Sequence, residues 1–355
     1  MLRLEPRGRQ STAMIYASPV IAVALTLITG IVIFAAIGVD PVTALVTFFV
    51  EPLGTPYGLA ELAVKASPLV LIGTGLALGF RANVWNIGAE GQFTLGAIAG
   101  GGLGLLFPES ESPLVLPAMM LAGIAGGMAW AAIPAWLKTR FNANEILTSL
   151  MLTYVAQYLL GYLVHGPWRS PEGYNFPETR MFSAAASLPV LVEGTRLNVG
   201  AVVALVVVAV GWLVLARALV GFQLRVVGLA PRAARFAGFD GTRLVWLAML
   251  IGGGLAGLAG LFEVAGPIGQ LIPAISPGYG FTAIIVAFMG RLHPVGVLLA
   301  GLLLALSYLG GEAAQISLGM PSAVTGIFQG VLLFYLLGCD VLILYRPRLR
   351  REAPA

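Results

Sequence analysis

The stretch LNVGAVVALVVVAVGWLVLA, residues 197–216, contains twenty consecutive residues without a charge. A helix needs about 20 predominantly apolar residues to cross the hydrocarbon core of a bilayer, so this stretch is long enough to span a membrane. Similar runs recur along the chain, which is 58% hydrophobic and 10% charged, with a mean hydropathy of +0.92. A soluble protein would need a much larger charged surface. The sequence therefore predicts an all-α, polytopic membrane protein surrounded by lipid.

Apolar runs between charged or Pro- and Gly-rich breaks predict ten membrane-spanning segments. They lie near residues 19–38, 66–80, 84–107, 113–137, 145–165, 197–216, 244–265, 279–291, 293–310 and 322–344. An even number of crossings places both termini on the same side of the membrane. The first run follows an arginine-containing tail, as in a signal peptide. However, the run is longer than the apolar region of a usual signal peptide, and no small-x-small cleavage pattern follows it. We expect it to be a retained first helix.

Basic residues concentrate in alternate connections between these spans. They lie in the tail 1–18, at Lys138 and Arg140, in the segment 217–243 and in the tail 345–355. The segment 166–196, with three arginines and three glutamates, belongs to the opposite side. Because short cytoplasmic loops are enriched in Lys and Arg, we expect both termini and 217–243 to be cytoplasmic and 166–196 to be extracytoplasmic. This bias alone can account for the arginines of 217–243.

Several classes of function fit the sequence poorly. The formal net charge of +4 comes from 20 basic and 16 acidic residues, and the basic ones follow the topology, so the charge does not indicate nucleic-acid binding. The single cysteine, Cys339, allows no internal disulfide. His165 and His293 are too far apart in the sequence to form a metal-ligand motif. No nucleophile, base and acid stand together as a catalytic set requires.

The chain also lacks the sequence signal of an ATPase. Its only two lysines, Lys65 and Lys138, follow Val64 and Leu137, so no Gly-Lys-Ser/Thr phosphate-binding loop exists. No segment outside the apolar runs is long enough for a nucleotide-binding domain. If ATP drives the function, another polypeptide hydrolyses it, and we expect no cofactor and no metal ion on this chain.

Two predicted spans are short and interrupted. The run 66–80 ends at GFRANVWNIGAEGQ, where polar side chains break the apolar pattern. The run 279–291 ends at Gly290 and Arg291 before Pro294 restarts the chain. Each half of the sequence thus combines a short helix, a break and another helix. This pattern is typical of transporters built from internal repeats, with discontinuous helices around a central path.

The stretch NIGAEGQ, residues 86–92, is a candidate for a re-entrant turn at that path. Non-helical backbone inside a bilayer needs protein or water as hydrogen-bond partner, and an ionisable side chain there suggests function. The candidate path residues are Asn86, Gly88, Glu90 and Gln92. The alternative is that Glu90 and Gln92 only tie down the turn without contacting a solute.

A glycine-rich stretch at 252–260 has a structural interpretation. Gly252, Gly254 and Gly257 match the dinucleotide-binding pattern G-x-G-x-x-G, but they lie inside an apolar run with no preceding soluble strand. Gly253 and Gly257 instead form a small-xxx-small face, where we expect two helices to pack closely.

The segment GFQLRVVGLAPRAARFAG, residues 221–238, holds Arg225, Arg232 and Arg235. Pro231 suits the first position of a helix and Gly238 suits a C-terminal stop, which predicts a helix over 231–237 about 10 Å long. Arg232 and Arg235 would share one face, and the other face would be formed by Ala233, Phe236 and Ala237. Lipid headgroups could hold such a helix, but its low-bulk apolar face fits a groove on a partner protein better.

Five stretches together carry a family resemblance. They are GLALGFRANVWNIGAEGQFTLGA, LKTRFNANEILTSLML, GFQLRVVGLAPRAARFAGF, GGGLAGLAGLFEV and GYGFTAIIVAFMGRLHPVGVLLAG. In this order they resemble the permease subunits of bacterial ABC importers in the branched-chain amino acid/simple-sugar permease superfamily. The larger permease of purine-nucleoside importers is the most similar group. The resemblance spans roughly residues 15 to 345 and implies a single permease domain over 1–355, in the bacterial cytoplasmic membrane, that moves a nucleoside by alternating access.

The resemblance also implies partners and site residues. The partners are a second, homologous permease, a cytoplasmic ABC ATPase that binds ATP and Mg, and a lipid-anchored or periplasmic substrate-binding protein. The segment 217–243 becomes the ATPase-coupling loop, with coupling residues Arg225, Gly228, Pro231, Arg232, Ala233, Ala234, Arg235 and Gly238. Two residues depart from the family. Thr153 replaces an expected asparagine, which leaves the exact substrate in doubt and adds Thr153 to the path candidates, and Arg232 stands where an acid is common.

Three alternatives remain open. A permease for ribose-like sugars belongs to the same class, and competition of uptake by nucleosides or by ribose would separate the two. A secondary transporter or channel would work without an ATPase. A membrane enzyme would need the catalytic residues that the sequence lacks.

Overall fold

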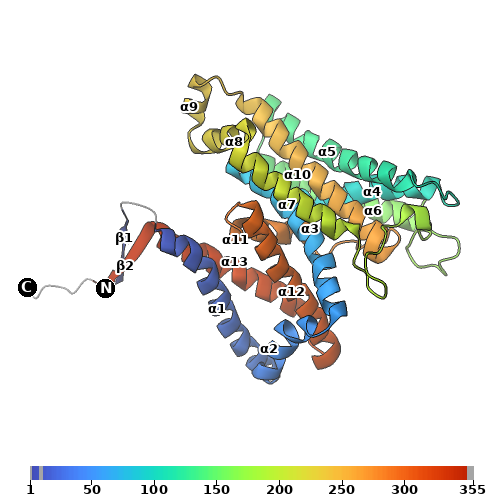
Figure 1. Cartoon of the computed structure of the whole chain (residues 1–355), viewed down its shortest axis with the longest axis horizontal. Coiled ribbons are helices and arrows are strands. Elements are labelled where there is room, and N and C mark those ends of the chain that lie inside the picture. Colours follow the sequence, from blue (N-terminus) through green and yellow to red (C-terminus); the bar gives the residue numbers. More distant parts are fainter. Residues whose placement is uncertain (1, 8–10, 350–355) are drawn as a thin grey trace, which may run out of the picture. The chain divides into compact units, whose positions relative to one another are not determined.

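The computed structural model describes residues 2–7 and 11–349, and these residues form a predominantly helical chain. The helices are α1 (Thr12–Ile37), α2 (Pro41–Phe49), α3 (Pro56–Arg81), α4 (Ala89–Leu106), α5 (Val115–Phe141), α6 (Glu145–His165), α7 (Val199–Arg217), α8 (Leu219–Leu229), α9 (Pro231–Phe236), α10 (Gly241–Glu263), α11 (Tyr279–Met289), α12 (Pro294–Leu318) and α13 (Ala323–Leu344) (Figure 1). Short 3₁₀ turns lie at Glu51–Leu53 and Ala184–Ala186, and a π-helical turn at Val264–Ile268 extends α10. The all-α prediction is confirmed.

Eight of these helices are long and apolar enough to cross a membrane, namely α1, α3, α5, α6, α7, α10, α12 and α13. The other two predicted spans correspond to shorter helices. The run 84–107 becomes helical only at Ala89, which leaves α4 with 18 residues, and the run 279–291 contains α11 with 11 residues. These are the two elements that the breaks in the sequence shorten.

The prediction of a short span at 66–80 is wrong. Helix α3 begins at Pro56 and has 26 residues, so Glu61 and Lys65 lie inside it. These two charges set the predicted start of the span at residue 66. In the structure, Glu61 pairs with Arg196, and the side chain of Glu61 is buried. A helix can therefore continue through a charge whose partner comes from a distant part of the chain.

The described chain divides into two compact units. Unit 1 takes in the described residues of Met1–Pro56 and Leu306–Ala355, and unit 2 is Tyr57–Ala305. Helix α12 starts in unit 2 and ends in unit 1. The single domain expected over 1–355 thus contains two units, and each is described by itself below.

In unit 1, α1 packs against α13. Two polar pairs join these helices: the Ser18 hydroxyl donates to Oδ1 of Asp340 at 2.8 Å, and the hydroxyls of Thr29 and Tyr335 lie 2.8 Å apart. An aromatic core lies beside them, where the Phe328 ring stacks on Phe34 at 5.4 Å and on Phe48 at 5.1 Å between ring centroids. Stacked rings and hydrogen-bonded side chains stabilise helix contacts in a membrane, where water does not compete.

The ends of the described chain also belong to unit 1. Strand β1 (Leu2–Pro6) pairs antiparallel with β2 (Tyr345–Leu349), and a Glu5–Arg346 ion pair of 3.5 Å accompanies the pairing. Helix α1 begins at Thr12, where the Ser11 hydroxyl accepts a hydrogen bond from the backbone N–H of Met14. The predicted tails 1–18 and 345–355 therefore contain part of α1 and both strands, and residues 350–355 lie outside the described part.

In unit 2, α10 packs on α4 and α5 through glycines. A Cβ atom added at Gly257 of α10 would lie 2.9 Å from Cα of Gly127 of α5. A Cβ atom added at Gly253 of α10 would clash with Ala131, which also lies on α5. Gly96, on α4, lies against the backbone of Gly257. Gly253 and Gly257 thus stand where the backbones of three helices approach one another, and larger side chains would separate them.

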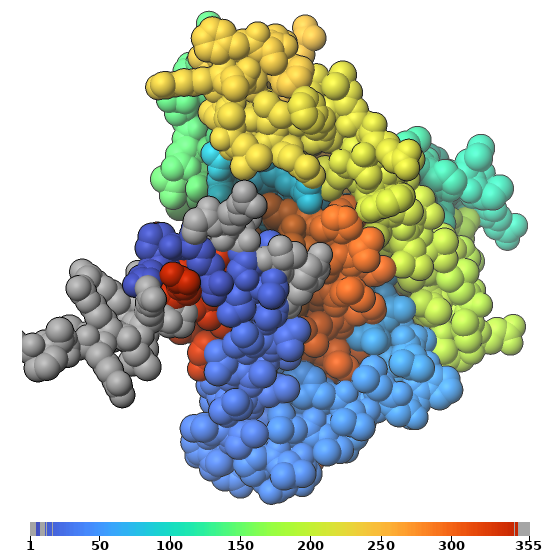
Figure 2. All heavy atoms as spheres, turned by 60° about the vertical axis from the view of Figure 1, so that its left-hand side comes forward, coloured from blue at the N-terminus to red at the C-terminus, as the bar shows by residue number. Residues whose placement is uncertain are grey.

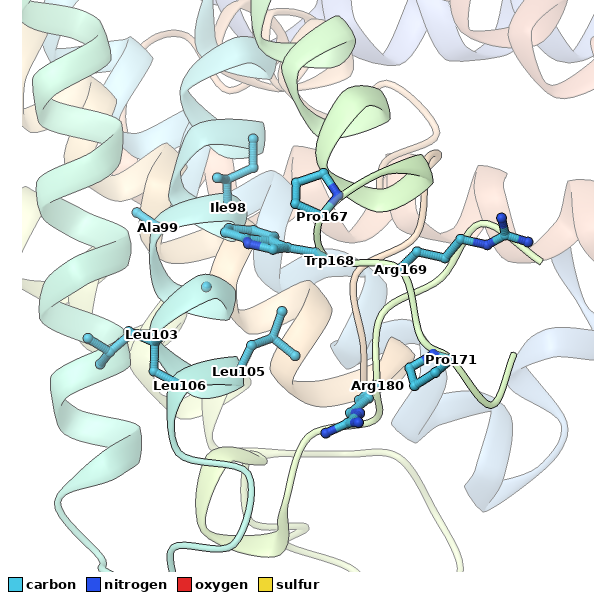
Figure 3. A pocket seen from close by; sticks show the side chains of 11 residues that line it. Ile98, Ala99, Leu103, Leu105, Leu106, Pro167, Trp168, Arg169, Pro171 and Arg180 are labelled. Atoms are coloured by element: carbon cyan, nitrogen blue, oxygen red, sulfur yellow. The ribbon is translucent and has the colours of Figure 1, made fainter. Parts of the chain in front are cut away.

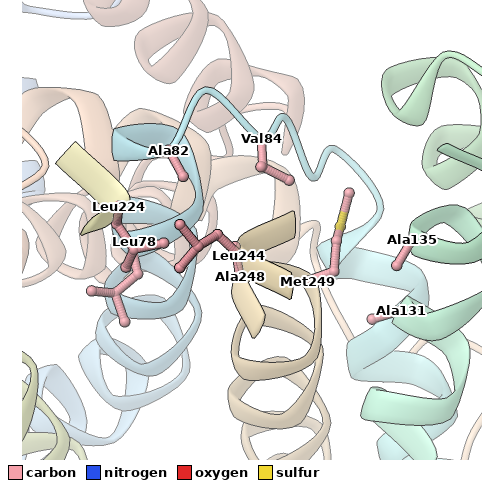
Figure 4. Close-up of a cluster of buried hydrophobic side chains, with 9 residues drawn as sticks. All are labelled: Leu78, Ala82, Val84, Ala131, Ala135, Leu224, Leu244, Ala248 and Met249. Atoms are coloured by element: carbon pink, nitrogen blue, oxygen red, sulfur yellow. The ribbon is translucent and has the colours of Figure 1, made fainter. Parts of the chain in front are cut away.

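One end of unit 2 holds an apolar cluster that joins four helices. Leu78 of α3, Leu224 of α8, Leu244 of α10 and Ala135 of α5 are buried together there (Figure 4). The full set of buried members is Leu78, Ala82, Val84, Ala131, Ala135, Leu224, Leu244, Ala248 and Met249. This cluster fixes α8, which follows the membrane span α7, against the ends of α3 and α10.

Candidate functional site

The chain between α3 and α4 is the first irregular part of the candidate site. Residues 84–88 are not helical, and Asn83 has a φ of 57° in the left-handed region that asparagine tolerates. The side chains of Asn86 and Gln92 exchange two hydrogen bonds, of 2.7 and 3.0 Å, and Oδ1 of Asn86 also accepts from the N–H of Gly88 at 3.2 Å. The two amides therefore hold the turn to the first residues of α4.

Helix α6 closes over this turn because two glycines leave room for it. A Cβ atom on Gly88 would lie 2.7 Å from Cβ of Ser149, and one on Gly91 would lie 2.8 Å from Cα of Thr153. The Ser149 hydroxyl accepts from the N–H of Ile87 at 3.2 Å. Thr153 is fully buried, and its hydroxyl donates to the backbone oxygen of Ser149 at 3.3 Å.

Glu90 connects this turn to the second irregular part of unit 2. Its carboxylate accepts a hydrogen bond of 2.6 Å from the backbone N–H of Gly280, in the first turn of α11. Gly280 packs directly on the backbone of Glu90, and the rings of Phe93 and Tyr279 meet edge to face with centroids 6.1 Å apart. The first turns of the two short helices, α4 and α11, thus lie against each other.

The path candidates of the sequence are therefore brought together, but they are buried. The side chains of Asn86, Glu90, Gln92 and Thr153 are each at most 3% exposed. Their hydrogen bonds run to one another, to backbone and to neighbouring helices. This geometry corresponds to the alternative in which Glu90 and Gln92 tie down the turn, and it gives none of the five, Gly88 included, an open surface for a solute.

The segment 217–243 forms two short helices on the surface of unit 2 (Figure 2, yellow). Helix α9 begins at Pro231, as predicted, and ends one residue earlier than predicted, at Phe236. Gly238 has a φ of 80°, the left-handed conformation in which glycine commonly ends a helix. Figure 1 shows α8 and α9 at one end of the helices of unit 2 and the segment 166–198 at the other.

The predicted division of α9 into two faces needs a correction. Ala234 is 1% exposed and faces the protein, whereas Arg232, Ala233, Arg235 and Phe236 are all exposed, Phe236 by 95%. Ala234 therefore anchors α9 within the chain, where α9 packs on α8 and α10. The outward face combines two arginines with a large apolar ring, so it is more bulky than the alanine-rich face that the sequence suggested.

A chain of contacts leads from α8 into the site. Gly228, on α8, lies against the backbone oxygen of Arg81 at the end of α3, with no room for a Cβ atom. The Arg81 guanidinium donates through Nε to the backbone oxygen of Leu292 at 2.8 Å. The N–H of Leu292 donates to Ala287 of α11 at 2.9 Å. Arg225, the remaining coupling candidate, is exposed on α8.

Sequence reasoning missed two ion pairs. Arg196, from the segment after α6, forms a two-pronged pair with the buried Glu61 of α3, and these hydrogen bonds raise the pKa of the Arg196 guanidinium above its ordinary value. Lys138 pairs with Glu145, the first residue of α6, and Glu145 also accepts from the N–H of Trp85 at 3.4 Å. The partners in the first pair are 135 positions apart, so no local pattern could indicate it.

A pocket of about 620 Å³ lies between α4 and the segment after α6 (Figure 3), at the end of unit 2 that is opposite α9 (Figure 1). Ile98, Leu103 and Leu106 of α4 form one wall, and Trp168 and Arg180 of the segment after α6 face them. Trp168 packs on Gly102, which has no side chain to exclude it. The pocket lies between α4 and the segment that the charge pattern assigned to the side opposite 217–243.

Comparison with known proteins agrees with this architecture. Residues 58–337 match the family described as "Branched-chain amino acid transport system / permease component". The chain is 39% identical to the glucose ABC transporter permease protein TsgB13 of Haloferax volcanii, over 100% of this chain and 97% of the relative. It is 30% identical to the guanosine ABC transporter permease protein NupP of Bacillus subtilis, over 89% and 91%. It is 26% identical to the nucleoside ABC transporter permease protein NupB of Lactococcus lactis, over 90% and 89%.

The superfamily that the five sequence stretches indicated is thereby confirmed. The apolar helices and the relatives agree on a multi-pass membrane protein. The relatives named for glucose and for nucleosides are both similar over most of the chain, so the family does not determine the solute. This chain belongs to the branched-chain amino acid transport system permease-component family and is an ABC transporter permease with a polytopic, all-α membrane fold.

Proposed function

We propose that this chain is the membrane-spanning subunit of an ATP-driven importer and that α8 and α9 receive the motion of a separate cytoplasmic ATPase, which binds the ATP and Mg. The observation that carries the proposal is the outward face of α9, where Arg232, Arg235 and the 95% exposed Phe236 stand on a helix anchored by Ala234. An exposed aromatic ring flanked by arginines is typical of protein interfaces. A second, homologous permease and a lipid-anchored or periplasmic substrate-binding protein complete the importer, in the cytoplasmic membrane with both termini inside.

The contact chain through Arg81 supports a mechanism. Movement of α8 would act on the end of α3 through Gly228, and Arg81 would transmit it to the break at Leu292 between α11 and α12. Helix α11 would pass it to α4 through Gly280 and Glu90. ATP binding to the ATPases would thus bias the permease between inward-open and outward-open states, which is alternating access.

We further propose that the imported solute is a sugar or a nucleoside, and we place the sugar first. The 39% identity to a glucose permease over the whole chain supports the sugar, and it changes the order that the sequence resemblance suggested. The guanosine and nucleoside permeases at 30% and 26% identity support the nucleoside as the second candidate. Uptake of labelled glucose in competition with unlabelled glucose, ribose, adenosine and guanosine separates the two.

The test of the import function uses the purified chain in proteoliposomes with its partner permease, ATPase and binding protein. We expect uptake that requires ATP and all four chains. Phe236→Ser should leave ATP hydrolysis in place and reduce uptake, whereas Leu114→Ser, at an exposed apolar residue in the connection between α4 and α5, should leave uptake unchanged. Uptake by this chain alone, driven by an ion gradient, would replace the importer by a secondary transporter.

A further inference from the structure

Helix α6 has two faces of opposite character. The face toward the protein holds Glu145, Ser149, Thr153, Ala156, Leu160 and Val164, all buried against α4 and α5. The opposite face is exposed, and it interleaves Tyr154, Gln157, Tyr158 and Tyr162 with the apolar side chains of Leu147, Met151 and Val155. At 100° per residue the three tyrosines and the glutamine fall within one side of the helix. The tyrosines are 49, 78 and 69% exposed, so the face is an open surface of unit 2.

These polar side chains lie inside a membrane span. Tyr154 is the tenth and Tyr158 the fourteenth of the 21 residues of α6, which is one of the eight helices long and apolar enough to cross a membrane. With a rise of about 1.5 Å per residue, Tyr158 lies about 10 Å from the end of the helix. Tyrosine at the headgroup level is common, but Tyr154 and Tyr158 lie deeper than that level.

The hydroxyls and the amide have no hydrogen-bond partner within the part of the chain that the structure describes. Within residues 2–7 and 11–349, no hydrogen bond is found for the side chains of Tyr154, Gln157, Tyr158 and Tyr162. Lipid tails offer none, so a face of this kind is unfavourable against hydrocarbon. Polar side chains in a span normally face a bundle interior or a water-filled cavity.

Helix α7 provides the contrast within the same unit. Its large exposed apolar side chains are Val202, Leu205, Val206, Val210, Trp212 and Leu213, and no Tyr or Gln occurs in α7. This is the apolar surface expected of a helix that faces lipid. Two spans of comparable length therefore differ in that α6 adds three tyrosines and a glutamine to an otherwise apolar exposed side.

We propose that the exposed face of α6 lines the solute path, with Tyr154, Tyr158 and Tyr162 as a ladder of aromatic contacts for an uncharged, hydroxyl-bearing ring. The inference rests on the proposed transport function and names the class of solute and the residues that contact it. The tyrosines recur every four residues, about 6 Å along the helix axis. Each offers a ring face for stacking and a hydroxyl that can donate or accept.

The charge of the face restricts the solute. Among the residues of α6, the only Asp, Glu, Lys or Arg is Glu145, which is buried and paired with Lys138. A free amino acid carries an ammonium and a carboxylate, and the tyrosine ladder offers neither of them an opposite charge. A sugar ring, alone or within a nucleoside, matches the ladder through its hydroxyls and through the apolar face of its ring.

The test combines water accessibility with solute protection. In a Cys339→Ala background, Tyr158→Cys and Tyr162→Cys are compared with Val206→Cys on α7, all in the assembled importer in proteoliposomes. A charged, membrane-impermeant methanethiosulfonate should modify positions 158 and 162 about tenfold faster than position 206, because a thiol reacts as the thiolate and hydrocarbon excludes that form. Glucose or guanosine should slow the reaction at 158, and leucine should not.

A second set of variants separates the ring from the hydroxyl. Tyr158→Leu should lower uptake about tenfold by removing a stacking surface, and Tyr158→Phe should lower it less. Trp212→Leu on α7 is the matched control that removes an exposed ring from the lipid-facing helix, and it should leave uptake unchanged. Equal losses in Tyr158→Leu and Trp212→Leu would contradict a specific role for Tyr158.

The outcomes distinguish this inference from the proposed function. Slow modification at positions 158 and 162 together with intact ATP-driven uptake would contradict the proposal that the tyrosines line the solute path. The proposed import function would not be affected. Protection by leucine alone would overturn the class of solute. Rapid modification with protection by glucose or guanosine, but uptake that needs no ATP, would support the ladder and overturn the importer.

Discussion

The carboxylate of Glu90 in α4 accepts a hydrogen bond of 2.6 Å from the backbone N–H of Gly280 in α11, 190 positions further along the chain. Both residues lie in the first turn of a short helix. Each helix N-terminus carries a partial positive charge from its unpaired N–H groups. A single carboxylate between two such ends therefore serves both helices, and this explains an acidic residue that is 2% exposed in a membrane protein.

Replacement of Glu90 should destabilise the protein in a graded way. Glu90→Ala leaves the Gly280 N–H without its partner, and a buried donor left unpaired costs about 1–3 kcal/mol. Glu90→Gln keeps an acceptor oxygen and loses only the negative charge between the helix ends, so its loss should be smaller. Thermal unfolding in detergent, followed by far-UV circular dichroism, measures the order. Equal midpoints for the natural chain and Glu90→Ala would refute the role of this bond.

Replacing a glycine by alanine should have opposite effects at Gly257, where α10 contacts α5, and at Gly326 of α13. At Gly257 a methyl group would lie 2.9 Å from Cα of Gly127, so Gly257→Ala should force the helices apart and cost about 1–3 kcal/mol. Gly326, in α13, has no atom within 4 Å of its would-be Cβ. There Gly326→Ala should stabilise by about 0.4–1 kcal/mol, because alanine has less backbone freedom to lose.

Unfolding midpoints of the two glycine variants, measured side by side, check this pair of predictions. A stabilising Gly257→Ala would mean that the helices can move apart without loss of packing.

The ion pair between Arg196 and Glu61 should be stabilising because the carboxylate is buried while the guanidinium is half exposed. Arg196→Ala leaves Glu61 charged and unpaired inside α3, and we expect a loss of about 1–3 kcal/mol. In the double variant Arg196→Ala, Glu61→Ala the buried charge is gone, so part of this loss should return. A double-mutant cycle on unfolding midpoints measures the coupling. If the two single effects simply add, the pair contributes nothing specific.

Local signals allowed parts of this fold to be predicted closely. Helix α6 covers residues 145–165 as expected, because Asn144 caps it through its side chain and the apolar run ends at His165. Helix α9 begins at Pro231 and stops before Gly238, since proline fixes the first turn and glycine accepts the left-handed conformation. Such features depend on neighbours within a few residues, which the sequence displays directly.

Long-range contacts could not be predicted in the same way. The charges of Glu61 and Lys65 placed the start of the predicted span at residue 66, because no local pattern shows that Glu61 pairs with Arg196, 135 positions away. Glu90 was singled out correctly as unusual, but its partner is a backbone N–H, which every residue except proline possesses. In α9, alanines stand at both 233 and 234, so the pattern could not determine that Ala234 is the inward one. The tyrosines on the exposed side of α6 were missed because the apolar residues of this helix suffice for a span.

The bond between Arg81 and Leu292 gives the last prediction, which concerns coupling rather than stability. Arg81 holds the end of α3 to the break before α12, and Gly228 of α8 rests on the same turn. Arg81→Gln removes the 2.8 Å bond to Leu292 and should interrupt the contact chain from α8 to α11. ATP hydrolysis should continue in the assembled importer while uptake per ATP falls. The matched control is Arg243→Gln, because Arg243 is 87% exposed and its guanidinium forms an ion pair of 3.1 Å with the neighbouring Asp240. If both variants lose uptake equally, positive charge at this end of unit 2 matters and the specific bond does not. If Arg81→Gln keeps the natural ratio of uptake to hydrolysis, motion reaches α11 by another route.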